Sequence, residues 1–456
     1  MSSFFHNHTH DLSAPMMNSS VSSSLSEVET ITANFDHRDI GMMIEDGKGC
    51  KEVDEGIITL ITNLFHKGQY TTLIDVANEI LTDAPGSIFV NNAIAESYAK
   101  LGDDRQAINY YEKAADLIPL TKDFKQNKHY LPNIYNNLGV ALKSLGFLDK
   151  SESIFKQAIS LDPKSSAAYN NYGNLLNDKA DVSSAQKCFL KAIDLDPNNF
   201  SAYWNLHSTV NDFDQAKRII ELCLERAPEH SEAIFTLAGI NAFAGKDSHF
   251  DVLMKTEYSN NPILTSIKWI LSLPALPEIH FNRWSVFDRA IQLSNTDRSF
   301  YEFGVWMGDS FRYVMQSFKS GYGFDTFKGL PESWGPIPKG TYSSYGAIPD
   351  VSGGEFIVGE FEKTLPEFFS ISRPKAGLIN FDADLYTSTY CALMNAKPVI
   401  DTSTIMIFDE FIVNQNWEQD EFKALNDFCE IKGISYEVLI ISLFTKQAVV
   451  RLSSTK

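Results

Sequence analysis

The sequence predicts a chain of two architectures, an α-helical repeat solenoid followed by an α/β domain with a doubly wound, mostly parallel sheet. Two observations predict it. In the first half, similar segments recur at an interval of 34 residues, beginning at Tyr135, Tyr169 and Tyr203. From Arg298 onward, short apolar runs alternate with helical patterns. Stacked helix pairs account for the first pattern, and βαβ units account for the second.

Length, charge and cysteine use limit the class of protein. At 456 residues, the chain is long enough for two or more domains. Its formal net charge of -19 argues against a nucleic-acid partner, because Lys and Arg side chains capture phosphates. No apolar run reaches the length of about 18 residues that a membrane span needs. The five cysteines are scattered, which favours reduced thiols and a cytoplasmic location.

The repeats share residues as well as spacing. Phe155 matches Phe189, and Ala158 matches Ala192, in each case 34 residues later. This pattern resembles the tetratricopeptide repeat (TPR), a pair of antiparallel helices with small residues where the helices touch. Weaker copies precede and follow the two best ones. An insertion at residues 120–130 interrupts the period, and we expect it to form an extended loop or a longer helix.

The patterns divide the chain into four expected segments. Residues 1–49 are rich in Ser, Asn and His and lack a signal-peptide pattern, so we expect a disordered tail. Residues 50–256 form the TPR-like repeats. Residues 257–298 form a linker with prolines and one packing helix. Residues 299–456 form the α/β domain.

Asparagines gather early in the first helices of the repeats, which tend to face the concave groove of such an array. Asn side chains can hydrogen-bond an extended backbone in both directions, so we expect a protein or peptide partner there. The competing interpretation is that these are solvated or interhelical polar residues. The asparagines concerned are Asn136, Asn137, Asn170, Asn171 and Asn205.

Acidic residues follow two apolar runs that read as buried strands. Asp382 and Asp384 follow GLINF, and Asp409 and Glu410 follow TIMIF. In an open parallel sheet, ligands bind beyond the carboxyl ends of the strands. Four carboxylates at one edge would suit a hard cation such as Mg²⁺, which prefers oxygen ligands. The alternative is that these acids are helix caps and solvated loop charges.

A second candidate site follows the first two strands of the domain. Gly304 permits a sharp turn after Glu302, and Gly308 lets a helix N-terminus approach a ligand closely. Asp325 ends the second strand, where a carboxylate can accept the hydroxyl protons of a ribose. The alternative role of Asp325 is a cap for the next segment.

Four motifs in this order, EFGVWMGDS, GFDTFKGLPESW, FDADLYTST and IFDEF, resemble the class I S-adenosylmethionine-dependent methyltransferases. More narrowly, they are similar to the macrocin O-methyltransferase-like family, which methylates sugar hydroxyls with the help of a metal ion. The resemblance covers residues 275–456. It implies a Rossmann-like fold, S-adenosyl-L-methionine as methyl donor and Mg²⁺ as metal.

The resemblance also implies roles for single residues. The methionine end of the cofactor would lie against Glu302, Gly304 and Gly308, and its ribose against Asp325. The loop after Asp325 would fold over the cofactor, and Trp334 and Tyr342 in it could shape the acceptor pocket. The implied metal ligands are Asp382, Asp409 and Glu410, with Asp384 as a further candidate.

The chemistry supports this interpretation, because a hydroxyl is a poor nucleophile until a cation or a base assists it. Asp382 is our candidate for the catalytic base or for a metal ligand, and the sequence does not separate the two roles. We expect transfer to a saccharide hydroxyl, with the repeats recruiting a partner or carrier. Two alternatives stay open: a TPR interaction scaffold with a catalytically silent domain, and a nucleotide-binding enzyme such as a dehydrogenase.

Overall fold

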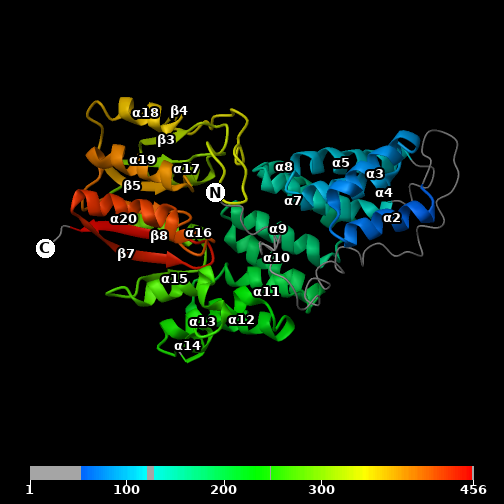
Figure 1. Cartoon of the computed structure of the whole chain (residues 1–456), viewed down its shortest axis with the longest axis horizontal. Helices are drawn as coiled ribbons and strands as arrows, with labels where there is room; N and C mark the ends of the chain where they lie inside the picture. Colours follow the sequence, from blue (N-terminus) through cyan, green and yellow to red (C-terminus); the bar gives the residue numbers. More distant parts are fainter. Residues whose placement is uncertain (1–52, 121–127, 247, 454–456) are drawn as a thin grey trace. The chain divides into compact units, whose positions relative to one another are not determined.

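The helical repeats and the α/β domain predicted from the sequence are both present (Figure 1). The computed structural model describes residues 53–120, 128–246 and 248–453. The described chain divides into two compact units between Asp178 and Lys179. The tail expected at residues 1–49 and most of the insertion at residues 120–130 lie outside the described residues.

The first unit consists of consecutive helix pairs. Asp54, Ser87 and Asp103 cap three of the helices by accepting hydrogen bonds from backbone amides of the first turn. Gly139 lies where two helices touch, since a Cβ atom there would come within 2.8 Å of the Phe155 ring. The helices are α2 (Glu55–His66), α3 (Tyr70–Asp83), α4 (Ile88–Lys100), α5 (Asp104–Leu117), α7 (Leu131–Ser144), α8 (Leu148–Leu161) and α9 (Ser166–Asp178). Short 3₁₀ turns lie at η2 (Ile118–Leu120) and η3 (Lys128–Tyr130).

The second unit begins with further helices of the same kind. Asp181, Asn199 and Asp212 cap three of them in the way described for the first unit. These helices are α10 (Val182–Leu195), α11 (Phe200–His207), α12 (Phe213–Arg226), α13 (Ser231–Phe243), α14 (Ser248–Leu253), η4 (Glu257–Asn260) and α15 (Pro262–Leu271).

A mixed sheet forms the centre of the second unit. Its strand order is β1-β7-β8-β6-β5-β2-β3-β4, and only β8 runs antiparallel to its neighbours β6 and β7. The strands are β1 (Glu278–His280), β2 (Ser299–Phe303), β3 (Gly321–Asp325), β4 (Gly354–Val358), β5 (Ala376–Phe381), β6 (Ile405–Phe408), β7 (Ser435–Ser442) and β8 (Ala448–Ser453). The doubly wound, mostly parallel sheet predicted from the sequence is therefore confirmed.

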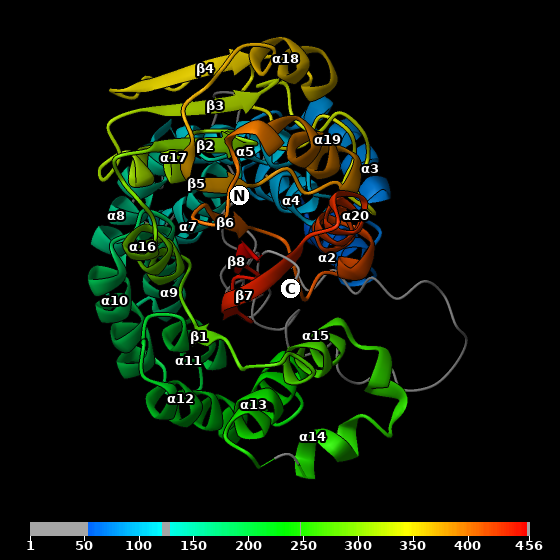
Figure 2. The ribbon, with the colours of Figure 1, turned by 90° about the vertical axis from the view of Figure 1, so that its left-hand side faces the viewer.

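Helices cover both faces of this sheet (Figure 2). One face packs against α16 and α17, and the other packs against α18, α19 and α20. Their bounds are α16 (Arg283–Leu293), α17 (Asp309–Val314), α18 (Phe361–Phe368), α19 (Tyr386–Ala396) with η5 (Lys397–Val399), and η6 (Trp417–Gln419) with α20 (Glu421–Lys432).

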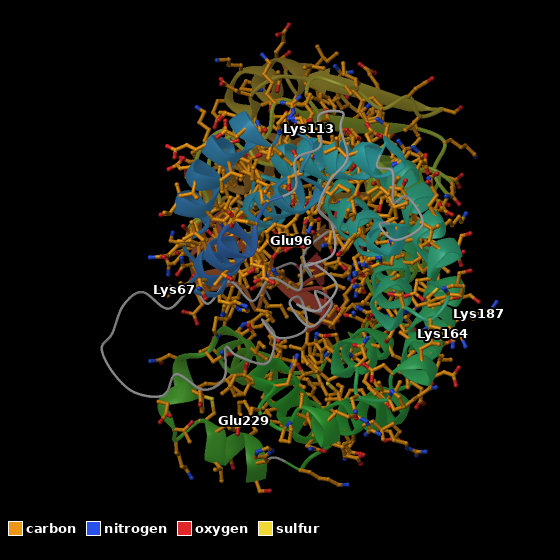
Figure 3. The ribbon with its side chains drawn as sticks, turned by 90° about the vertical axis from the view of Figure 1, so that its right-hand side faces the viewer. Lys67, Glu96, Lys113, Lys164, Lys187 and Glu229 are labelled. Carbon is orange, nitrogen blue, oxygen red and sulfur yellow. The ribbon has the colours of Figure 1, made fainter. Side chains whose placement is uncertain are left out.

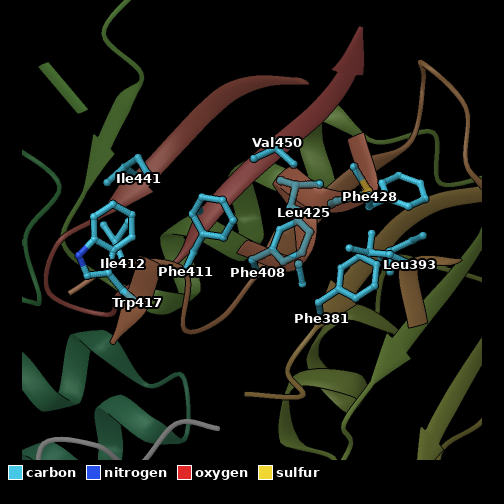
Figure 4. Close-up of a cluster of buried hydrophobic side chains, with 14 of the residues drawn as sticks. Phe381, Leu393, Phe408, Phe411, Ile412, Trp417, Leu425, Phe428, Ile441 and Val450 are labelled. Carbon is cyan, nitrogen blue, oxygen red and sulfur yellow. The ribbon is translucent and has the colours of Figure 1, made fainter. Parts of the chain in front are cut away.

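A row of phenylalanines closes the core beneath the carboxyl ends of the central strands. Phe303 stacks on Phe324 and Phe381, with ring centroids 4.9 and 5.3 Å apart, and Phe381 stacks on Phe408 at 4.7 Å. All four side chains are fully buried, and Figure 4 shows two of them within the surrounding cluster. Strands that end in rigid, stacked rings hold the residues after them in defined places.

One expectation about organisation needs correction. The segment expected to be a linker contains strand β1, which pairs with β7, so His280 lies in a strand and not before the first strand. A strand of three residues is too short to produce a periodic pattern, which is why the sequence did not indicate it. The compact units divide between Asp178 and Lys179, so helices α10 to α15 lie in the same unit as the sheet.

Candidate active site

The turn after β2 comes very close to the end of β5. Gly304 has φ +90°, and a Cβ atom there would lie 1.8 Å from the backbone oxygen of Asp382. Only glycine fits such an approach. Gly308 also has positive φ and caps α17, where a Cβ atom would meet Pro349 at 2.6 Å. The predicted Gly-rich turn is thus a structural requirement of this sheet edge.

Asp325 organises that turn from the end of β3. Its Oδ2 accepts hydrogen bonds from the amides of Val305 and Trp306 at 2.7 and 2.8 Å, and its Oδ1 accepts one from Phe327 at 2.6 Å. These contacts match the capping role that the sequence left open. A carboxylate has about four acceptor positions, so capacity for a ribose hydroxyl remains. The ribose role stays a prediction.

Glu302 is fully buried at the end of β2. Its Oε1 accepts a hydrogen bond from Asn380 of β5 at 2.8 Å. Burial, with a smaller contribution from the charge of Asp382, raises the pKa of Glu302 to about 8. This side chain therefore holds its proton more firmly than an ordinary glutamate does.

A pocket opens beside this turn. The empty space in and above it has a volume of about 530 Å³, which includes space open to solvent. Gly304, Asp325, Asp382 and Asp384 are among the residues that line it. Glu302, Gly308, Asp409 and Glu410 are not among its lining residues. Four of the eight predicted site residues therefore line this pocket, and the other four do not.

The long loop after β3 contributes to this pocket, as the sequence predicts. Leu330 and Tyr342 of the loop line it. Two contacts fasten the loop: Trp334 Nε1 donates to Asp420 Oδ2 at 3.1 Å, and Thr387 Oγ1 donates to Glu332 Oε1 at 2.7 Å. Tyr342 lies near the acidic residues, since their charges add to burial in raising the pKa of its phenol.

The acidic residues after β5 and β6 form one buried cluster. Burial and then mutual repulsion raise the pKa values of three of them, Asp382, Asp384 and Glu421. Burial also raises the pKa of Glu410, although Lys446 opposes it. The described members are Asp382, Asp384, Asp409, Glu410 and Glu421, each at most 4% exposed.

Arg283 lies between two acids of this cluster, Asp382 and Asp409. Its Nη1 lies 2.8 Å from Asp409 Oδ1, and its Nη2 lies 3.3 Å from Asp382 Oδ2. Gln447 Nε2 donates to Asp409 Oδ1 at 2.7 Å. Although burial opposes it, these neighbours hold the pKa of Asp409 below its ordinary value.

Glu410 and Glu421 complete the cluster. Lys446 Nζ lies 3.1 Å from Glu410 Oε2, and Glu421 Oε2 accepts a hydrogen bond from the amide of Glu410 at 3.1 Å. Sequence reasoning did not identify Arg283, Lys446, Gln447 or Glu421. Arg283 lies in the segment expected to be a linker, and no motif marks the others, so the sequence held no signal for them.

The predicted magnesium site does not fit this arrangement. Asp382 and Asp409 lie close enough to share a cation, but the guanidinium of Arg283 has that place, and Glu410 pairs with Lys446. Within residues 53–120, 128–246 and 248–453, no group of three His, Cys, Asp or Glu side chains is arranged to hold a metal ion. Direct ligation by Asp382, Asp409 and Glu410 is therefore corrected to pairing with side-chain cations.

The asparagines of the repeats bond to one another across helices. Asn171 Nδ2 of α9 donates to Asn136 Oδ1 of α7 at 3.0 Å, and Asn136 Nδ2 donates to Asn137 Oδ1 at 3.3 Å. Asn170 and Asn205 are buried, at 3% and 2% exposed. The interhelical interpretation therefore holds for Asn136 and Asn171.

Comparison with known proteins identifies the repeats. Two tetratricopeptide repeat models match the chain, one at residues 154–187 and the other at residues 90–119 and 132–165. The TPR prediction is therefore confirmed for these residues. No curated protein sequence matches the chain. Among the described residues, no helix has the length and apolar character needed to cross a membrane.

Solved structures resemble parts of the chain at a distance. A structure of MamA is 18% identical and covers 40% of this chain and 98% of its own, with a TM-score of 0.31. PilF of Pseudomonas aeruginosa is 15% identical and covers 47% of this chain and 96% of its own, with a TM-score of 0.40. The O-methyltransferase NovP is 16% identical and covers 38% and 81%, with a TM-score of 0.28. At such TM-scores, none of these similarities carries an argument about function.

Proposed function

We propose that the α/β unit transfers a methyl group from S-adenosyl-L-methionine to a hydroxyl of a sugar or glycan-like acceptor. The observation that carries the proposal is one pocket lined both by the tight turn at Gly304 with Asp325 and by the acids Asp382 and Asp384. The four sequence motifs that resemble methyltransferases all meet at this edge.

The residues around the pocket suit a cationic methyl donor. S-adenosylmethionine supplies an electrophilic methyl group on a positively charged sulfur. Asp382 and Asp384 are buried carboxyl groups at the pocket wall, and they attract a cation strongly where water is scarce. Gly304 lines the pocket beside them.

Asp382 and Asp384 are also the candidates for the general base. Burial raises the pKa of both carboxyl groups, and a carboxylate with a raised pKa takes a proton more readily. As the acceptor oxygen forms its bond to the methyl carbon, the carbon–sulfur bond breaks and the hydroxyl proton passes to the carboxylate. Arg283 pairs with Asp382 and also with Asp409, and these ion pairs hold the Asp382 side chain in place.

Calorimetry with the full chain tests donor binding. We expect S-adenosylmethionine to bind the wild type and the affinity to fall at least about tenfold in Asp325→Asn, because the carboxylate shapes the turn and lines the pocket. The matched control is Asp350→Asn, an exposed acid of the same long loop that is not a pocket residue. Equal affinity in wild type and Asp325→Asn would remove Asp325 from the site.

Mass spectrometry with labelled methyl donor and a panel of nucleotide sugars tests the acceptor. We expect Asp382→Asn to lose turnover by about 100-fold or more, because the amide cannot take the proton. Unlabelled sugars throughout the panel, together with full donor binding, would reject the saccharide class.

The second candidate function is recruitment of a protein or peptide by the repeats. The observation in its favour is the polar inner side of the first unit. Asn92 Nδ2 donates to Glu96 Oε1 at 2.9 Å, and Figure 3 shows Glu96 on the inner side of the helices while Lys67 and Lys164 lie at their outer edge. Fluorescence anisotropy of a labelled peptide library with the full chain tests this. Substitution of Asn137, a groove candidate with a half-buried side chain, by Ala should weaken any selected peptide.

A further inference from the structure

Two segments supply the cationic and amide partners of the acid cluster, and both rest on helix α11 of the repeats. The first segment is Asn282–Arg283 at the start of α16. The second is the turn 443–447 between β7 and β8, which carries Lys446 and Gln447. All of these residues lie within the second compact unit.

Asn282 joins α11 to α16 with one side chain. Its Oδ1 accepts hydrogen bonds from the amides of Trp284 and Ser285 at 2.8 and 3.3 Å, which caps α16. Its Nδ2 donates to the backbone oxygen of Ser208, just past the end of α11, at 2.9 Å. Asn282 is 2% exposed. The residue that follows it, Arg283, reaches Asp382 and Asp409.

Phe444 fixes the second segment to the same helix. Its ring packs edge-on against His207, with centroids 4.4 Å apart, and against Trp204 at 5.6 Å. Burial lowers the pKa of His207 to about 3, so this imidazole stays neutral and the contact stays apolar. Lys446 adopts φ +65°, which costs an ordinary side chain energy unless its surroundings hold it there.

We propose that helix α11 is a positioning element of the acid cluster, acting through Asn282 and Phe444 as positioning residues. Asn282 places Arg283 between Asp382 and Asp409, and Phe444 places Lys446 and Gln447 against Glu410 and Asp409. The repeats of the second unit are therefore part of the scaffold of the candidate active site. The catalytic consequence rests on the proposed function, whereas the placement of the cations can be tested without it.

If α11 places Arg283 and Lys446 against the acids, a variant that displaces either side chain should bind a divalent cation more tightly than the wild type does. With Arg283 or Lys446 displaced, the buried carboxylates lose one counter-charge and attract an external cation more strongly. Carboxylate oxygens are good ligands for Mn²⁺ and Mg²⁺. A variant that is only destabilised would not bind a divalent ion more tightly, so the affinity for Mn²⁺ separates positioning from general stability.

The experiment measures binding of Mn²⁺ alone to the full chain by electron paramagnetic resonance. Arg283→Gln removes the cation directly and is the reference variant, for which we expect affinity at least about tenfold above the wild type. Asn282→Ser keeps a capping oxygen but loses the donor to Ser208, and Phe444→Ala removes the ring from α11. Both should gain Mn²⁺ affinity in the direction of the reference variant.

Two controls sharpen the result. Phe444→Leu keeps apolar volume against α11 and should stay closer to the wild type than Phe444→Ala does. Phe235→Ala removes a buried ring of α13 that packs against Tyr258, so it should lose stability without gaining Mn²⁺ affinity.

Two outcomes would overturn the proposal. In the first, Asn282→Ser and Phe444→Ala both bind Mn²⁺ with wild-type affinity while Arg283→Gln binds it more tightly. This result would show that α11 does not position the cations. The other is tight Mn²⁺ binding by the wild type that Arg283→Gln does not improve, which would show that Arg283 does not neutralise the acids. Calorimetry with S-adenosylmethionine on the same proteins decides the proposed function independently.

Discussion

Both compact units bury polar side chains, but they balance the charges differently. In the first unit, Lys143 of α7 pairs with Asp178 of α9 at 2.8 Å, and Asn171 donates to Asn136 at 3.0 Å. In the second unit, the acid cluster has five carboxyl groups, and the cations that pair with it among residues 179–246 and 248–453 are Arg283 and Lys446. A repeat meets a similar neighbour at each step, so its polar groups find partners within the array. The sheet edge gathers side chains from separate strand ends, and its surplus charge marks the candidate site.

The largest effect should come from removing the cation inside the cluster. Arg283→Met leaves Asp382 and Asp409 without their partner in a buried setting, which typically costs about 3–5 kcal/mol in the free energy of unfolding. The matched control is Arg289→Met, which removes an exposed pair with Glu278 and should cost no more than about 1 kcal/mol. Urea unfolding of the full chain measures both.

Equal losses in Arg283→Met and Arg289→Met would mean that the buried pair contributes no more than a surface pair. The surplus charge of the second unit would then not depend on Arg283, and the comparison between the two units would lose its main support.

The second effect concerns the close approach of β2 and β5. Gly304→Ala adds a Cβ atom 1.8 Å from the backbone oxygen of Asp382, so we expect both loss of stability and loss of donor binding. Gly340→Ala is the matched control, because φ there is +87° and nothing lies within 4 Å of the added Cβ atom. A left-handed backbone alone costs about 1–3 kcal/mol in stability. Any further loss of stability in Gly304→Ala measures the clash between the added Cβ atom and the backbone oxygen of Asp382. Thermal unfolding with and without S-adenosylmethionine checks it, and equal melting temperatures in the two variants would contradict the close approach.

The third effect is a pH dependence that differs between the units. Burial raises the pKa of Glu302 to about 8 and that of Glu96 to about 7, both from 4.5. The folded chain then binds more protons than the unfolded chain above pH 4.5, so each residue lowers stability as pH rises to its folded pKa. Glu302→Gln should therefore gain stability relative to the wild type between about pH 5 and about pH 8.

Glu96→Gln should show the same gain, but it should be complete nearer neutral pH because the pKa of Glu96 is raised less. Urea unfolding at several pH values measures both variants. A stability difference from the wild type that does not change with pH would show that the two glutamates titrate normally.

Local sequence was enough to predict much of this protein. The 34-residue spacing of Tyr135, Tyr169 and Tyr203 indicated the repeats. Family models at residues 90–119, 132–165 and 154–187 confirm those around Tyr135 and Tyr169. The apolar runs before Asp382 and Asp409 indicated neighbouring parallel strands, and β5 and β6 pair in parallel. Because the carboxyl ends of parallel strands meet at one edge, that pattern also predicted a common acidic cluster, which the structure contains.

Other features had no local signal. Strand β1 is three residues long and exists because β7 offers it an edge. The pocket includes Gly304, Asp325, Asp382 and Asp384 but not Glu302 or Gly308, because one turn at Gly304 sets which side chains face outward. Periodicity and motif spacing do not contain that geometry.

The sequence by itself determined the two architectures and the clustering of acids, since both follow from apolar periodicity and from residues adjacent to strand ends. Only the tertiary structure decided what neutralises the acids. Arg283 lies 126 residues before Asp409 and 99 before Asp382, in a segment whose own pattern predicts a linker and one packing helix. A buried charge takes its partner from whatever packing brings within reach, and in this protein the partner is a guanidinium.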